Sequence, residues 1–196
     1  AVFLLAGEAA KDAGFPYEYE FRVKYILRGN RLEVSYIVTN LDEKTMYYGI
    51  GAHEAYATPE GIEKYYAVFD ETESLKSNVL HGNLLGHETI DLTHDSDTLP
   101  LKYEYFAVDA IVLRNVNSRA VTLRSSLNDR AVRVEFPGFD YLLFWTKPGA
   151  PYICIEPWCN FQDWVDTDKD ITQKPGVIAL QPGERRIHTH TIEFIG

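Results

Sequence analysis

The chain has 196 residues and a formal net charge of −10, from 29 acidic and 19 basic side chains. This acidic field disfavours nucleic acid and anionic membranes as partners, and it argues more weakly against a phosphorylated substrate. The length suits a single domain over residues 1–196, and the 13% aromatic content favours sheets and ring-shaped ligands.

The first segment is an apolar run, Val2 to Ala6, which is too short to span a bilayer and lacks the basic flank of a signal peptide. We interpret it as core. Residues 8–17 begin with helix formers and then contain Gly14 and Pro16, so a short connecting turn is expected there. A start at Ala rather than Met suggests processing, tagging or loss of a longer N-terminal part.

A β-hairpin follows. Apolar and charged residues alternate from Tyr17 to Leu27, as in a half-buried strand. Gly29 and Asn30 make a tight turn, and the alternation resumes from Leu32 to Val38. These two strands should therefore pair antiparallel.

The next strand, Thr45 to Ile50, leads into Gly49-Ile50-Gly51-Ala52-His53. Glycines on both sides of an apolar residue suggest a close backbone approach or a bulge, which would turn the His53 side chain out of the ladder. The alternative is a histidine that ends a strand and bonds a backbone carbonyl. The local sequence leaves both interpretations open.

The middle of the chain offers fewer signals. A strand is expected over residues 64–70, and the polar stretch from Glu71 to Leu99 predicts hairpins and long loops. Its histidines have spacings that match no helical or strand ligand pair, so we expect them to be solvated. They are His81, His87 and His94.

A strand is predicted from Tyr103 to Ala107, and Asp109 then interrupts the apolar run Val108 to Leu113. An acid at the mouth of a buried strand either bonds its own backbone in a turn or accepts hydrogen bonds from a ligand. Further strands are expected over residues 120–125, 132–136, 141–145, 177–180 and 187–194. About a dozen short strands without a long helix predict an all-β sandwich or barrel.

The stretch Ile153-Cys154-Ile155-Glu156-Pro157-Trp158 carries the strongest chemical signal. Because proline cannot donate to a ladder, we expect the strand to end at Glu156. A carboxylate fenced there by aromatic residues would be desolvated, which raises its pKa toward the range of a general base. The alternative is a surface glutamate beside a turn. The aromatic residues are Trp158, Phe161 and Trp164.

The chain has two cysteines, Cys154 and Cys159, without a second Cys/His pair at metal-ligand spacing. Neither a disulfide framework nor a zinc site is therefore indicated. A reducing compartment is the simplest interpretation, and we expect a cytoplasmic protein.

Several motifs occur in a fixed order along the chain. They are Gly49 to Tyr56 around His53, Val108 to Ile111, Glu156-Pro157-Trp158 with Asp163, and the closing turns Lys174 to Gly176 and Gln181 to Glu184. Through them the sequence resembles the aldose 1-epimerase (galactose mutarotase) family, in the bacterial branch with the motifs Gly-Gly-His-Pro-Ala-Phe and Glu-Pro-Trp-x-Gly-x-x-Asp. The resemblance extends from about Tyr17 to the end of the chain.

The resemblance implies a large antiparallel β-sandwich, the galactose mutarotase-like supersandwich, with a sugar in a cleft on one sheet. It implies that His53 is the general acid that protonates the ring oxygen and that Glu156 is the base that takes the anomeric proton. Asp109 would accept hydrogen bonds from sugar hydroxyls, and Trp158 would stack on the ring. No metal or organic cofactor is implied. We expect these residues to meet on one face of the sandwich.

Two residues depart from the family motifs: Glu54 stands where the family has Pro, and Asn160 stands where it has Gly. Family members also carry an N-terminal portion with an Arg or His that reaches the sugar. We therefore expect residues 1–196 to be the C-terminal two thirds of a longer fold, or a shortened member of the family.

The first functional hypothesis is a mutarotase that acts on a free aldose, with a small sugar as its partner. One alternative is a non-catalytic carbohydrate-binding sandwich. Another is a hexose-6-phosphate 1-epimerase, which would need clustered cations near the cleft. The sequence gathers no such cluster from its scattered arginines Arg114, Arg124, Arg130 and Arg133.

Overall fold

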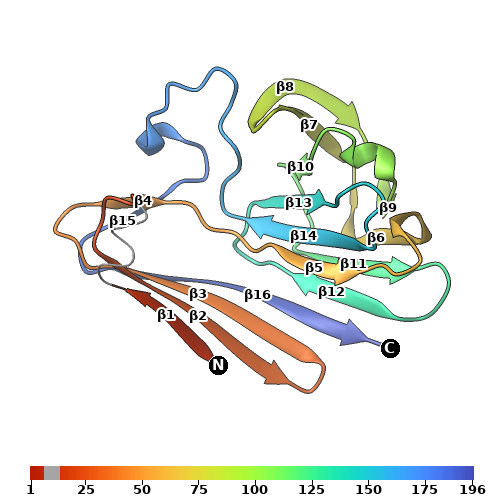
Figure 1. The fold of residues 1–196 in the computed structure, drawn as a ribbon, viewed down its shortest axis with the longest axis horizontal. Coiled ribbons are helices and arrows are strands. Elements are labelled where there is room, and N and C mark those ends of the chain that lie inside the picture. The colour runs from red at the N-terminus through yellow and green to blue at the C-terminus, as the bar shows by residue number, and fades with distance from the viewer. Residues whose placement is uncertain (7–13) are drawn as a thin grey trace.

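The structure is a computed structural model that describes residues 1–6 and 14–196. Most of the described chain forms two antiparallel sheets packed face to face, with the long strands β2, β3 and β16 running along one side of the molecule (Figure 1). The helix-forming part of the turn expected over residues 8–17 lies outside the described residues. No helix that is described is long and apolar enough to cross a membrane.

The larger sheet has eight strands in the order β1-β2-β3-β16-β12-β11-β6-β9. They are β1 (Val2–Ala6), β2 (Tyr19–Arg28), β3 (Arg31–Asn40), β16 (Arg185–Ile195), β12 (Ala131–Glu135), β11 (Ala120–Ser125), β6 (Tyr65–Glu73) and β9 (Ser96–Pro100). The predicted hairpin is confirmed, because β2 and β3 pair antiparallel with Leu27 opposite Leu32.

The smaller sheet has six strands in the order β5-β14-β13-β10-β7-β8, and β15 pairs with β4 apart from both. These strands are β5 (Glu54–Ala57), β14 (Tyr152–Trp158), β13 (Tyr141–Trp145), β10 (Ile111–Leu113), β7 (Lys76–His81), β8 (Leu84–Asp91), β15 (Ile178–Leu180) and β4 (Met46–Tyr48). The described helices are single 3₁₀ turns: η1 (Ile62–Lys64), η2 (Tyr103–Phe106) and η3 (Ile171–Gln173).

The core lies between the two sheets, as the alternating strands require. Phe69 of β6 meets Phe144 of β13 across it, with ring centroids 6.4 Å apart. Ile153 and Ile155 of β14 belong to this core. Side chains at the intervening positions of β14 therefore point to the other face of the six-stranded sheet.

The sequence predictions for residues 103–107 and for residues 2–6 are wrong. The strand expected from Tyr103 to Ala107 is η2, because a spacing of three brings Tyr103 and Phe106 to the same side of a 3₁₀ turn, where Phe106 is buried. The run Val2 to Ala6 is exposed rather than core. It forms β1 at the end of the larger sheet, where its only strand partner among the described residues is β2.

The region from Glu71 to Leu99 contains more strand than expected. The hairpin of β7 and β8 and the strand β9 take up most of it. The histidines of this region are exposed, as predicted, and each lies within ion-pair distance of a carboxylate.

Candidate active site

The sequence predicted that this strand would end at Glu156. In the structure, β14 continues through Pro157 to Trp158. Pro157 accepts a hydrogen bond from the Ala52 amide at 3.0 Å and cannot return one. The Trp158 indole Nε1 instead donates to the Ala52 carbonyl at 2.9 Å. The side chain after the proline thus satisfies the carbonyl that the proline leaves open, and the ladder survives.

The glycines before His53 permit a close approach between this segment and the end of β14. Gly51 lies opposite Trp158, and a Cβ on Gly51 would come within 2.3 Å of the indole Cδ1. A Cβ on Gly49 would come within 2.1 Å of the Asn160 side chain. The close backbone approach predicted from Gly-x-Gly is therefore observed, and the departure at Asn160 is accommodated by Gly49.

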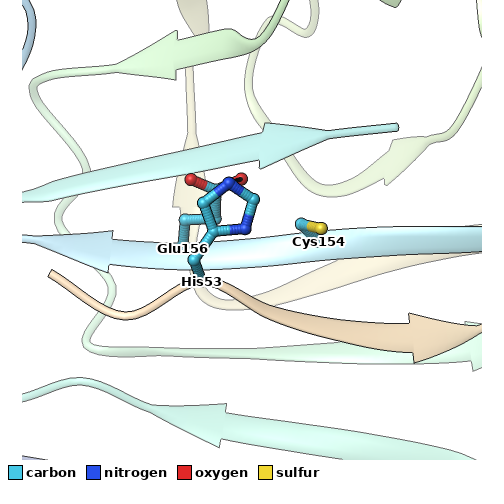
Figure 2. Close-up of side chains that lie close together, drawn as sticks. All are labelled: His53, Cys154 and Glu156. Carbon is cyan, nitrogen blue, oxygen red and sulfur yellow. Dashed lines mark ion pairs between the residues drawn. The ribbon is translucent and has the colours of Figure 1, made fainter. Parts of the chain in front are cut away.

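Register brings His53 and Glu156 together. Glu54 of β5 pairs with Ile155, and Gly51 pairs with Trp158, so His53 lies directly across from Glu156. The His53 Nε2 is 3.4 Å from the Glu156 Oε1. Figure 2 shows the imidazole and the carboxylate side by side on the same side of β14.

The two side chains differ sharply in exposure. His53 is 59% exposed, whereas Glu156 is 2% exposed. The Glu156 Oε1 has no hydrogen-bond partner among the described residues, because the contact with His53 does not reach hydrogen-bond geometry. Burial, followed by the negative charges of Asp109 and Glu54, raises the pKa of Glu156 to about 8.

The desolvation of Glu156 has a structural source in a second apolar cluster, on the outer face of the six-stranded sheet. Leu143, which pairs with Glu156 from β13, belongs to this cluster. Phe161 is part of the cluster, and Trp158 and Trp164 pack against it, so the three aromatic residues singled out in the sequence gather on this face. The full outer cluster is Leu80, Leu85, Val112, Leu143 and Phe161.

Asp109 lies in the loop that precedes β10, and its Oδ1 accepts a hydrogen bond from the Ala110 amide at 2.9 Å. It therefore bonds the neighbouring backbone, which is one of the two roles that the sequence left open for it. The negative charge of Asp109 also helps to raise the pKa of Glu156, so the two carboxyl groups interact electrostatically. The structure thus brings His53, Glu156 and Asp109 to one region, with Trp158 on the same face of β14 as Glu156.

The side chain of Glu54, the other residue that departs from the motifs, points in the opposite direction from that of His53. The Glu54 Oε1 lies 3.3 Å from the Nε2 of His190, a fully buried residue of β16. The Tyr36 hydroxyl also donates to Glu54, at 3.4 Å. Glu54 thus faces the space between the sheets, while its neighbour His53 faces outward.

Sequence reasoning missed two residues at this site. Trp145 of β13 approaches the His53 ring edge-on, with centroids 6.1 Å apart. Cys154, two positions before Glu156, pairs with Trp145 across the β13–β14 ladder and is buried. The period of two in β14 places Cys154 and Glu156 on one face, and this signal was available in the sequence.

The sequence indicated no metal site, but the fold assembles one possible donor set. One ligand atom each from His53, Cys154 and Glu156 lie within 4.8 Å of one another. His53 is far from the other two donors in the sequence, and Cys154 and Glu156 are separated by the apolar Ile155. Their spacing therefore matches no metal-binding motif.

The arrangement can exchange two protons with a single small molecule. A buried carboxyl with a pKa raised to about 8 is mostly protonated at neutral pH, and its ionised form takes up a proton more readily than an ordinary carboxylate does. The exposed imidazole beside it can donate one, and it is reachable from solvent. Such a pair suits a reaction in which neighbouring atoms lose and gain protons together.

Comparison with known proteins agrees with this geometry. A model of the family described as aldose 1-epimerase matches residues 1–193. The chain is 37% identical over 175 residues to the chromosomal protein LacX of Lactococcus lactis subsp. lactis, a match that covers 85% of this chain and 58% of LacX. The plasmid LacX of the same subspecies matches equally. The chain thus spans 58% of the length of these curated relatives.

Two solved structures are similar over nearly the whole chain. A galactose mutarotase-like protein from Lactobacillus casei ATCC 334 has a TM-score of 0.89 at 24% identity, covering 99% of this chain and 69% of that one. A galactose mutarotase related enzyme from Lactobacillus acidophilus has a TM-score of 0.88 at 26% identity, covering 100% and 67%. The predicted all-β fold, a large antiparallel sandwich of the galactose mutarotase type, is confirmed.

Proposed function

Because the chain belongs to the aldose 1-epimerase family, we propose that it acts as a mutarotase, which interconverts the α and β anomers of a free aldose. The observation that carries this proposal is the separation of 3.4 Å between the His53 Nε2 and the Glu156 Oε1. In a cyclic hemiacetal the hydroxyl that loses a proton and the ring oxygen that gains one are bonded to the same carbon. The acid and the base must therefore be neighbours.

Glu156 takes the proton of the anomeric hydroxyl, and protonated His53 gives a proton to the ring oxygen. The bond between C1 and the ring oxygen breaks with its electron pair going to that oxygen, and C1 becomes an aldehyde carbon. Rotation about the bond from C1 to C2 presents the other face of the aldehyde, and ring closure reverses both proton transfers. Each transfer by a positioned group contributes about 10²–10⁴-fold to the rate. The chemistry requires neither a metal nor an organic cofactor.

Asp109 and Trp158 serve the substrate rather than the proton transfers. The Asp109 Oδ2, the oxygen that does not bond Ala110, would accept a hydrogen bond from a sugar hydroxyl. Trp158 lies on the same face as Glu156, and its ring offers an apolar plane for the sugar. Its indole N–H is already bonded to Ala52 and is not available to the ligand.

The arrangement of arginines favours a free aldose over a phosphorylated one. Arg124 and Arg133 belong to the eight-stranded sheet, and Arg130 immediately precedes β12 of the same sheet. Arg114 follows β10 and lies over the Trp164 ring, 4.7 Å from its centroid. Three of the four arginines therefore belong to the sheet that does not carry Glu156, and only Arg114 lies against the outer aromatic cluster. Both cysteines are unpaired, which supports the cytoplasmic location that we propose.

Polarimetry of freshly dissolved α-glucose and α-galactose tests the proposal, with the spontaneous rate subtracted. Glu156→Gln keeps the shape of the side chain but removes its basicity, so kcat should fall on the order of 10²-fold or more while sugar affinity changes little. His53→Asn should act similarly. A Glu156→Gln protein with the full rate would show that the base lies elsewhere. Sugar binding without any rate in the unaltered protein would replace the mutarotase by a binding module.

A further inference from the structure

We propose that His53, Cys154 and Glu156 form a binding site for a borderline-soft divalent cation such as Zn²⁺, and that a cation bound there switches off the acid–base pair. The first part stands on the donor geometry alone. The second part rests on the proposed function.

The three donors face one another because of strand geometry. Cys154 and Glu156 lie two residues apart on β14 and share a face, while His53 lies across from Glu156 (Figure 2). Their ligand atoms all lie within 4.8 Å of one another. Zinc ligands stand about 2.0–2.3 Å from the ion, so the donors need to draw in only slightly. The exposed His53 ring has the freedom to do so.

A second observation also points to a ligand at this position. The Glu156 Oε1 is aimed into the cluster from a side chain that is 2% exposed, and it lacks a hydrogen-bond partner in the described chain. Buried polar atoms are usually satisfied, so an unpartnered carboxylate oxygen requires an explanation. A cation between this oxygen, the thiol and the imidazole would satisfy it.

The donor set selects the class of cation. One sulfur, one nitrogen and one oxygen suit Zn²⁺ and similar transition metals, whereas Mg²⁺ and Ca²⁺ prefer oxygen donors throughout. Three protein ligands leave a fourth position for water or a sugar oxygen. Binding releases the thiol proton and any proton on the carboxyl group, and no oxidation or reduction occurs.

An alternative role for Cys154, as an oxidation sensor, fits the structure less well. Cys154 is only 2% exposed, so an oxidant in solution has little access to its sulfur. Reactive sensor cysteines are accessible to solvent, and Cys154 is not. The residue is therefore better suited to ligation, in which the metal itself displaces the proton.

Inhibition follows directly from the ligands involved. The metal would occupy the Glu156 oxygen that takes the anomeric proton and the His53 nitrogen that protonates the ring oxygen. A cation at this site leaves neither group free for catalysis. Mutarotation should therefore be inhibited by Zn²⁺ and restored by a chelator.

The binding test uses Co²⁺ and Zn²⁺ with chelator-treated protein. We expect one Co²⁺ per chain with a thiolate-to-metal charge-transfer band, and calorimetry with Zn²⁺ should give the same stoichiometry. Cys154→Ser should abolish the band. His53→Asn, at an exposed position, should weaken Zn²⁺ binding on the order of tenfold or more, since even the loss of an outer-shell partner costs about 10–100-fold.

Cys159→Ser is the matched control. Cys159 is the other buried free cysteine, and its Sγ lies 3.4 Å from the Nδ1 of His188, away from Glu156. This variant should keep the band and the affinity. A band that persists in Cys154→Ser, or the absence of a band in the unaltered protein, would overturn the proposed site.

The inhibition test compares each variant with its own metal-free rate. Zn²⁺ should lower the rate of the unaltered protein and of Cys159→Ser at the concentrations at which calorimetry shows binding. For the same inhibition, Cys154→Ser should require a Zn²⁺ concentration on the order of tenfold higher. Equal inhibition of both cysteine variants would refute the switch. A protein that binds Co²⁺ through Cys154 but shows no mutarotation would overturn the proposed function and leave the metal site standing.

Discussion

Replacing Glu156 by Gln should stabilise the protein at alkaline pH while it removes activity. The folded-state pKa of Glu156 is raised from 4.5 to about 8, chiefly by burial. Between these values the folded protein holds a proton that the unfolded chain has released. Stability therefore falls as pH rises through this window, and the loss is complete above the folded pKa. A neutral glutamine contributes no such slope.

The size of the effect follows from the same shift. Between about pH 5 and about pH 9, the unaltered protein should lose about 4 kcal/mol of unfolding free energy relative to Glu156→Gln. Urea unfolding at the two pH values measures this difference, with a chelator present so that no cation occupies the site. Other titrating groups are common to both proteins and cancel. If the unfolding free energies of the unaltered protein and of Glu156→Gln change with pH in parallel across this range, Glu156 is not buried as a protonated acid.

Three further substitutions test neighbouring parts of the site. Asp109→Asn removes a charge that raises the pKa of Glu156, so the acidic limb of kcat/KM should move to lower pH; a limb that stays in place would mean that the two carboxyls do not interact. Trp158→Phe leaves the Ala52 carbonyl without the indole donor and should cost about 1–3 kcal/mol in urea unfolding; no loss would show that water replaces it. Gly51→Ala puts a Cβ within 2.3 Å of the Trp158 ring and should cost about 1–3 kcal/mol by the same measurement; unchanged stability would mean that the indole moves aside freely.

The alternating strands and turns of this chain were readable from the sequence, because a half-buried strand must repeat every two residues. The β2–β3 hairpin and the core positions Ile153 and Ile155 follow from that period. The period fails where aromatic residues fall three apart, as at Tyr103 and Phe106, and a 3₁₀ turn forms there instead. Local pattern also could not show that β1 lies at an exposed sheet end, since burial depends on which strands become neighbours.

The candidate site was predictable in part. Period and motif located Glu156 and singled out His53, but the local sequence left open whether His53 would face outward. Local pattern could not show how Pro157 is tolerated within a strand, because the compensating bond comes from the side chain of Trp158 to Ala52, a residue distant in the chain. Long-range pairing of this kind is set by tertiary structure and leaves no local periodic signal.

The pairing of His53 with Glu156 is a consequence of register, and the core fixes that register. Ile153 and Ile155 are buried between the sheets, so the residues on either side of Ile155 must face outward. A slip of β14 by one residue would place Glu156 between the sheets and turn Ile155 away from the core, and both changes cost free energy. The same apolar alternation that stabilises the sandwich therefore holds the carboxyl opposite the imidazole, and the geometry on which the proposed mutarotase activity rests is maintained without a hydrogen bond between the two side chains.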